Sequence, residues 1–224
     1  MEASEACSSH SSSLDAHNEC PYREKKSNIN PCTLMPHPEI LNATSIDGIS
    51  SPLSKGLSTE RESSTIPKVT APGHVDETWK YPSPRMFYHA LLRKGYATDP
   101  QDIDSMLFIH NQLNEGVWKH ILEWENFMQP NATGRCQPLL KSFQGRPQKL
   151  SPKAWFAHKF LGADKPFDRH DWVIERCGKK VRYVIDYYEN GVDQSGSPTM
   201  NVCVRPALDS IESIFYRFRR FLDS

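Results

Sequence analysis

The sequence lacks a long hydrophobic run, an excess of charge of one sign and a basic N-terminus. No apolar segment approaches the roughly 20 residues that a transmembrane helix needs. Lysine plus arginine and aspartate plus glutamate both number 27, so net charge gives no argument for a nucleic-acid partner. The first residues include Glu2 and Glu5, where a secretory signal or a transit peptide carries bases. We therefore expect neither a membrane span nor a cleaved presequence.

The cysteines and glycines also fall outside the common cofactor motifs. The six cysteines form no C-x-x-C pair and no cluster with histidine, so we expect no structural zinc site. A chain of 224 residues can fold without disulfides. We expect mostly reduced thiols, with Cys177 and Cys203 as small buried side chains. No glycine-rich phosphate loop is visible, so neither ATP nor a nicotinamide cofactor is expected.

Composition divides the chain near residue 75. Residues 1–75 contain a serine-rich stretch at 8–13 and few aromatic residues, and all five tryptophans follow Val75. So polar a segment buries too little apolar surface to offset the loss of chain entropy. We predict a disordered tail over residues 1–75 and a single folded domain over residues 76–224, which starts near Trp79.

The folded part contains several segments with helical patterns. Two of them, 83–95 and 151–162, each have a serine N-cap, proline at the first helical position and a glycine at the end. Apolar residues recur every three or four positions from 99 to 128, which predicts helix throughout. Asn111 and Asn114 both suit a helix cap better than a helix interior, which leaves open whether this segment is one helix or two. A last helix is expected from about Asp209 to the C-terminus.

The C-terminal third changes to the period of a β-strand. Residues 172–177 and 181–188 are rich in β-branched and aromatic side chains and flank Gly178-Lys179, which predicts a tight hairpin. Residues 201–205 indicate a third strand, stopped by Pro206. The fold class is therefore α+β, in which helices pack with a small antiparallel sheet.

His110 is the first candidate for chemistry. It lies in the apolar part of the 99–128 segment and could supply a neutral imidazole to a metal or to heme. In a continuous helix, Asn111, Glu115 and Trp118 form a row beside it, and an amide or carboxylate near a ligating imidazole raises its basicity. An ordinary buried histidine is the commoner case, and spacing alone does not choose between the two interpretations.

Two weaker candidates lie elsewhere in the chain. His170, next to Asp171, begins the hairpin, and Arg176 is one of several bases along it that could meet heme propionates; a solvated strand face is the alternative. Cys20-Pro21 in the tail is a dipeptide whose thiolate can bind ferric heme. The C-terminal helix is basic and aromatic, so it either lies on an anionic membrane surface or packs on the domain.

Several long motifs of the domain occur in an order that carries a family resemblance. They are Trp79-Lys-Tyr-Pro-Ser-Pro84, Phe87-Tyr88, Leu92-Arg-Lys-Gly95, Ile109-His-Asn-Gln-Leu-Asn-Glu115, Trp124-Glu125, Phe167-Asp-Arg-His-Asp-Trp172, Arg176-Cys-Gly178 and Tyr183-Val-Ile-Asp-Tyr-Tyr188. From about Trp79 to its end the chain resembles the holocytochrome c synthase family, also called cytochrome c-type heme lyase. The tail is similar in its Cys20-Pro21 motif, although some members carry more than one Cys-Pro.

The resemblance implies a lyase of the mitochondrial intermembrane space, peripheral on the inner membrane. Such an enzyme adds the vinyl groups of heme b to the cysteine thiols of a C-x-x-C-H segment in apocytochrome c, and so forms thioether bonds. Its substrates are heme with ferrous iron and apocytochrome c, with cytochrome c1 as a further candidate. In cytochrome c maturation of this kind, catalysis is chiefly positioning.

The resemblance also assigns roles to residues of this chain. His110 becomes the axial ligand of the heme iron, and the client's own histidine takes the opposite position. Asn111, Glu115 and Trp118 are expected to shape the heme pocket, with His170 and Arg176 as lesser candidates for binding heme. A non-catalytic heme chaperone or sensor, which holds heme through His110 or Cys20, is the alternative. A scaffold without enzymatic activity is a third hypothesis.

Overall fold

The computed structural model describes residues 56–69, 77–96, 98–129, 136–192 and 198–223. The N-terminal part opens with β1 (Ser63–Pro67), β2 (Thr78–Lys80), α1 (Pro84–Arg93), a 3₁₀ turn η4 (Pro100–Asp102) and α2 (Ile103–Met128). The C-terminal part contains β3 (Leu139–Gly145), α3 (Pro152–Leu161), β4 (Asp168–Arg176), β5 (Lys179–Val192), β6 (Pro198–Pro206) and α4 (Ile211–Leu222). The predicted tail, with its Cys20-Pro21 motif, lies largely outside the described residues.

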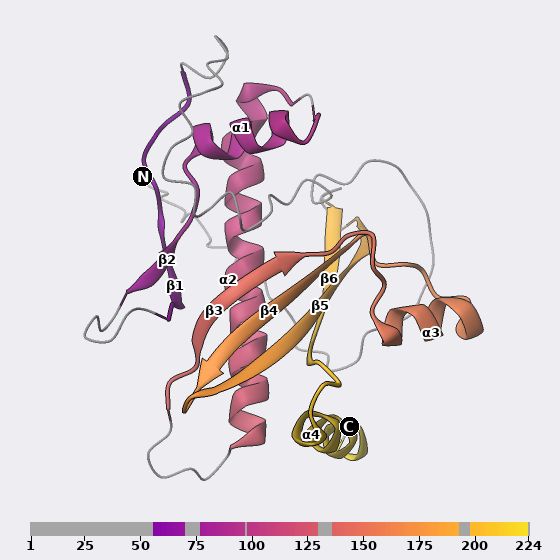
Figure 1. The fold of residues 1–224 in the computed structure, drawn as a ribbon. Coiled ribbons are helices and arrows are strands. Elements are labelled where there is room, and N and C mark those ends of the chain that lie inside the picture. The colour runs from indigo at the N-terminus through magenta and orange to yellow at the C-terminus, as the bar shows by residue number, and fades with distance from the viewer. Residues whose placement is uncertain (1–55, 70–76, 97, 130–135, 193–197, 224) are drawn as a thin grey trace, which may run out of the picture.

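The centre of the fold is an antiparallel sheet of order β3-β4-β5-β6, and the long helix α2 crosses one face of it (Figure 1). The main hydrophobic core lies between them and includes Val117, Ile121, Trp172, Ile174, Tyr183 and Ile185. A smaller hydrophobic cluster joins α1 to the N-terminal half of α2, through residues such as Phe87, Leu91, Ile103 and Leu107. This arrangement confirms the predicted α+β class.

The two Ser-Pro helices begin and end where the sequence predicts. Ser83 accepts a hydrogen bond from the backbone N–H of Met86, and Ser151 accepts one from Ala154. Gly162 ends α3 in the left-handed conformation, with φ of 66°, which a residue without Cβ adopts at little cost. These boundaries follow from local chemistry alone, because each cap uses side chains within one helical turn.

The segment from 99 to 128 forms one continuous helix after a short 3₁₀ turn. The structure therefore has one helix where the sequence left one helix or two open. Asn111 donates a side-chain hydrogen bond to Glu62, and Asn114 shares one with His110. Because each amide has a side-chain partner, it does not compete with the helix backbone for hydrogen bonds.

The predicted hairpin is present, but its turn lies one residue earlier than expected. Strands β4 and β5 pair from Asp168 with Tyr187 to Arg176 with Lys179. The turn residues are Cys177 and Gly178, with φ of 48° and 74°, as in a type I′ turn. The second strand also continues past Asn190 to Val192, where an irregular register with β6 accommodates the predicted stop.

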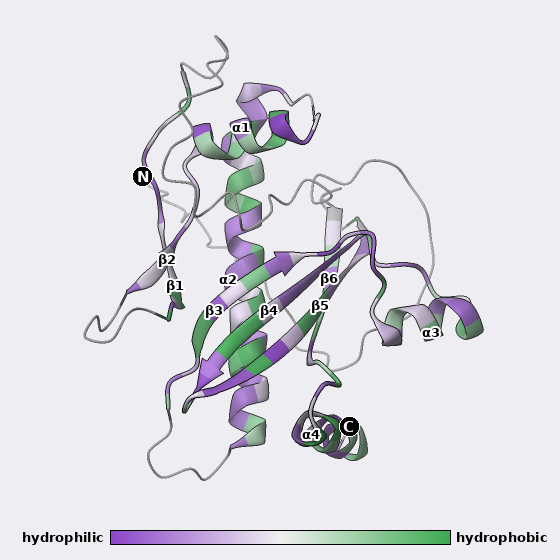
Figure 2. Cartoon of the chain, viewed as in Figure 1, coloured by the Kyte–Doolittle hydropathy of each residue, from purple (hydrophilic) through white to green (hydrophobic). Residues whose placement is uncertain are grey.

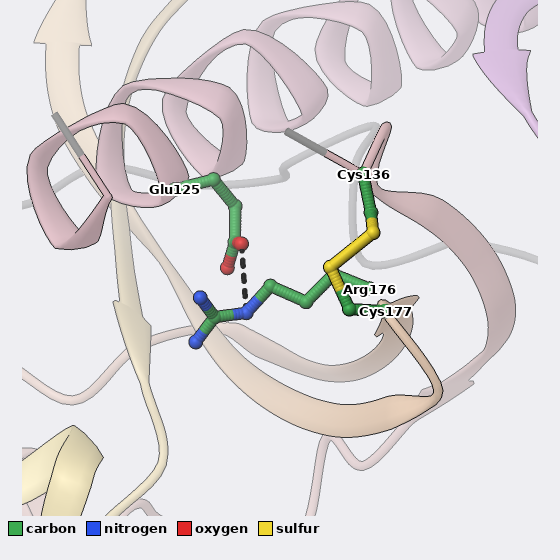
Figure 3. Close-up of a disulfide and its surroundings, with 4 residues drawn as sticks. All are labelled: Glu125, Cys136, Arg176 and Cys177. Carbon is green, nitrogen blue, oxygen red and sulfur yellow. Dashed lines mark ion pairs between the residues drawn. A yellow bond between two sulfur atoms is a disulfide. The ribbon is translucent and has the colours of Figure 1, made fainter. Parts of the chain in front are cut away.

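The expectation of mostly reduced cysteines is wrong for this turn. Cys177 forms a disulfide with Cys136, across a Cα–Cα distance of 5.4 Å and a sequence separation of 41 residues (Figure 3). Both residues are exposed, so Cys177 is not the small buried side chain that we predicted. Cys203 is buried as expected, but it too is disulfide-bonded. Nothing in the spacing of the cysteines marks this pairing, which depends on the fold bringing the residue before β3 to the β4–β5 turn.

The packed part of the chain begins before the predicted start at residue 76. Strand β1 pairs with β2, and Ile66 belongs to the main core with only 2% of its surface exposed. Lys68 extends this contact with a bridge to Leu140 of β3. The polar composition around β1 hides this strand in the sequence, because its stability comes from pairing with β2 and from burying Ile66.

Candidate functional site

His110 lies on α2, between the two hydrophobic clusters. Its side chain is 8% exposed and its ring meets the ring of Phe87 edge-on, with 5.8 Å between centroids. Its Nδ1 lies 3.3 Å from the amide nitrogen of Asn114. An asparagine amide can present either its nitrogen or its oxygen. With the oxygen presented, Nδ1 donates its proton to Asn114 and Nε2 keeps a free lone pair.

The surroundings of His110 keep its imidazole neutral. Burial is the largest cause that lowers the pKa of His110 from 6.5 to about 3, and the nearby charges of His170 and Lys94 act in the same direction. Asp168 and the amide of Asn111 oppose this shift only in part. A neutral imidazole is the form that ligates a metal, so His110 needs to lose no proton near neutral pH.

The structure brings the first two sequence candidates together, because His170 is close enough for its charge to act on His110. His170 is buried, its Nε2 lies 3.1 Å from a carboxylate oxygen of Asp168, and its ring packs against Tyr187. The sequence pointed to Asp171 as the neighbouring carboxylate. Successive strand residues face opposite sides of the sheet, so Asp168, two residues away, shares a face with His170. Asp171 instead pairs with Arg169 and Arg182.

Glu115 and Asn111 fasten another segment to α2, and the side chain of Asn111 also acts on His110. Glu115 accepts hydrogen bonds from the backbone N–H and hydroxyl of Thr65 and, at 2.8 Å, from the hydroxyl of Tyr81. Burial, together with Glu115, raises the pKa of Tyr81, so its phenol stays a donor. Asn111 donates to Glu62 at 2.9 Å. Together these bonds hold the chain around β1 and β2 beside the His110 turn.

Trp118 and Arg176 are both buried, and Arg176 lies away from His110. Trp118 is buried in the main core. Arg176 is also buried, and its Nε lies 3.0 Å from Glu125 (Figure 3). Its Nη2 lies 3.1 Å from Glu212. Glu125 follows His110 by 15 residues on a continuous helix, or about 22 Å along the axis. The structure therefore separates Arg176 from the site around His110.

Two residues of the site escaped the sequence analysis, and both had a detectable signal. Asn114 follows His110 by four residues, the spacing at which helical side chains meet. Asp168 precedes His170 by two residues, the spacing of one strand face. Cys20 and Pro21 lie outside the described residues. Within the described ranges, no group of three or more histidine, cysteine, aspartate or glutamate side chains could hold a metal ion.

Comparison with known proteins gives a consistent result. The family model of cytochrome c/c1 heme lyases matches residues 1–221. A probable holocytochrome-c-type synthase of Caenorhabditis elegans is 43% identical over 88% of this chain and 69% of its own length. The holocytochrome c-type synthase of Gallus gallus is 37% identical over 98% and 81%. A putative holocytochrome-c1 synthase of Schizosaccharomyces pombe is 44% identical over 74% and 75%. No solved structure matches this chain significantly.

These matches, added to a buried neutral imidazole in an α+β domain, define the chain as a heme lyase, an enzyme that attaches heme to apocytochrome c. More specifically, the chain belongs to the cytochrome c/c1 heme lyase family. A non-catalytic chaperone or sensor, the alternative drawn from the sequence, is not favoured by these relatives.

Proposed function

We propose that His110 is the axial ligand through which this enzyme holds heme b while thioether bonds form. The observation that carries the proposal is a buried imidazole whose Nδ1 has an amide partner, in surroundings that lower its pKa. Such a partner fixes the tautomer and the orientation of a ligating histidine. His170, held by Asp168 and near enough to His110 for its charge to act on it, contributes to binding heme.

The reaction needs no oxidant and no leaving group. The sulfur of each client cysteine bonds to one carbon of a heme vinyl group, and the thiol proton passes to the other carbon. The client thiols must be reduced, because a disulfide cannot add to an alkene, and ferrous iron fits the same conditions. With His110 on one face of the iron and the C-x-x-C-H histidine on the other, the porphyrin plane is fixed and each vinyl lies beside a thiol.

Heme reaches His110 only when the smaller hydrophobic cluster opens. Phe87 of α1 covers the imidazole, and α1 is joined to α2 mainly through this cluster. Opening the smaller cluster costs less free energy than opening the main core, because it exposes less apolar surface to water. Asn111 and Glu115 act in this scheme as positioning residues, since they hold the Thr65 and Tyr81 segment in place while α1 moves.

Apocytochrome c is the proposed client, with cytochrome c1 as a second candidate because the Schizosaccharomyces pombe relative is named for c1. The proposed location is the mitochondrial intermembrane space, peripheral on the inner membrane. Co-expression with apocytochrome c in a host without other maturation systems tests the activity. A heme stain that stays with the client on a denaturing gel is the expected result, and its absence would refute the proposed reaction.

We predict that the affinity of the purified protein for heme, measured without client, is nearly independent of pH between about pH 8 and pH 5. His110 is neutral throughout this range because its pKa is lowered to about 3. Heme titrations followed by absorbance measure this. An exposed histidine ligand would instead lose about tenfold in affinity for each pH unit below about 6.5, and that outcome would exclude His110 in its described environment.

Cys20→Ser is expected to reduce maturation only mildly, because the proposed chemistry needs the folded domain and one imidazole there. The yield of holocytochrome c after co-expression measures this effect, with a Ser12→Ala variant in the same tail as control. Complete loss of product with Cys20→Ser alone would assign heme delivery to the Cys20-Pro21 motif.

A further inference from the structure

Helix α4 is attached to the domain by its polar side. Tyr216 packs edge-on against Phe127 of α2, and the Arg220 guanidinium lies over the Trp124 ring at 4.3 Å from its centroid. Ser213, on the same side, is the only buried residue of the helix among those that the structure describes. At 100° per residue these three positions share one face of the helix.

The opposite face of α4 is apolar and faces outward. Its exposed residues are Ile211, Ile214, Phe215, Phe218, Phe221 and Leu222. The exposed fractions of Phe218 and Phe221 are 62% and 77%. The sequence correctly predicts one apolar side for this helix, and Figure 2 shows the helix at the periphery of the fold. A helix that only stabilised the domain would turn this side inward.

Helix α3 likewise turns small residues toward the domain and large apolar residues outward. Its inward residues are the small Ala154 and Ala157, whereas Trp155, Phe156, Phe160 and Leu161 are exposed. The charges of Lys153 on α3 and Arg217 on α4 are near enough to act on each other. Both helices lie at the edge of the fold, with α3 to the right of the sheet and α4 below it in Figure 1, and both present large apolar side chains outward.

The charges on both helices are mainly basic. Helix α3 contains Lys153 and Lys159 and no acidic residue, and α4 contains three arginines. The one acid of α4, Glu212, pairs with Arg176 of the domain. Exposed aromatic and aliphatic side chains flanked by bases are typical of helices that lie in the plane of a membrane surface. Among the described residues, no helix is long and apolar enough to cross a membrane.

We propose that α4, together with the exposed apolar side of α3, docks this enzyme on an anionic lipid surface. The inference deepens the proposed membrane association and rests on it. A second copy of the chain is a poorer occupant, because two such faces would bring arginines together. Lipid headgroups offer negative charge on both sides of the apolar stripe, and the acyl region accepts the phenylalanines.

Phe218→Glu tests the proposal in the full chain. We expect at least about a tenfold loss of binding to vesicles of phosphatidylcholine mixed with phosphatidylglycerol, because a buried Phe contributes strongly to partitioning and Glu repels the anionic surface. Vesicle flotation measures the bound fraction. Arg219→Glu should weaken binding to these vesicles but not to phosphatidylcholine alone. Phe108→Glu is the matched control, because Phe108 on α2 is 60% exposed and lies outside both helices.

Each outcome bears on the proposal. Unchanged flotation of Phe218→Glu, equal loss in Phe108→Glu, or a wild-type protein that binds no vesicles would overturn it. Loss of a dimer by size exclusion in Phe218→Glu, without loss of flotation, would assign the face to a second copy instead. His110→Ala should lose heme and still float, whereas Phe218→Glu should keep its heme spectrum. Failure of the docking surface and failure of the heme site are thereby distinguished.

Discussion

Replacing His110 by alanine or glycine is expected to remove most of the heme from the purified protein and to abolish formation of holocytochrome c. The variant loses the only imidazole proposed to reach the iron, and with it the geometry that places the vinyl groups beside the thiols. Absorbance spectra of the purified protein and a heme stain of co-expressed client measure the two effects. A variant with full heme and full activity would show that the site lies elsewhere.

Two further variants separate ligation from folding. Asn114→Ala keeps the imidazole but removes its amide partner, and loss of such a partner typically lowers metal affinity by about 10–100-fold. In His110→Gly, free imidazole added to the buffer should restore part of the heme spectrum, because the deletion leaves space where the ring was. A merely structural role for His110 predicts no spectral rescue.

Arg176→Ala is expected to destabilise the fold by about 3–5 kcal/mol, because it leaves a buried carboxylate without its partner charge. Glu125 and Arg176 are both buried and lie 3.0 Å apart, and the Tyr183 hydroxyl donates to the same carboxylate at 2.5 Å. Burial raises the pKa of Glu125, while Tyr183 and Arg176 hold it down. The free energy of unfolding of a protein is usually about 5–15 kcal/mol. A loss of this size should therefore clearly lower the urea concentration at which the protein unfolds.

Arg182→Ala is the matched control for this prediction, since it lies on the same hairpin. The side chain of Arg182 is about one-third exposed, and its partner Asp171 still pairs with Arg169 in the variant. The free energy of unfolding should therefore fall by only about 0–1 kcal/mol. Adding Glu125→Gln to Arg176→Met should recover part of the stability, because no buried charge is then left unpaired. If the Arg176→Ala variant unfolds at the same urea concentration as the wild type but lacks heme, Arg176 acts in heme binding and does not stabilise the fold.

The sequence made the helices and the central hairpin predictable because their signals are local. A serine cap accepts a hydrogen bond from an N–H three residues later, and the glycine that favours a turn with positive φ, Gly178, lies within the turn itself. The one-residue error in that turn is of the size expected when only neighbouring residues are considered. His110 was identified through its motif, while Asn114 and Asp168 were missed although both lie within four residues of a predicted site residue.

What the sequence by itself determined is therefore the helices, the strands β4, β5 and β6 and the family, and it led to His110 as the proposed ligand. The tertiary structure decided which distant residues meet: His170 with His110, Arg176 with Glu125, and Cys136 with Cys177. It also decided which way α3 and α4 turn their apolar sides. The physical reason is that periodicity specifies which residues share a face, whereas the partner of that face depends on how α2 crosses the sheet and how much apolar surface the whole chain buries there.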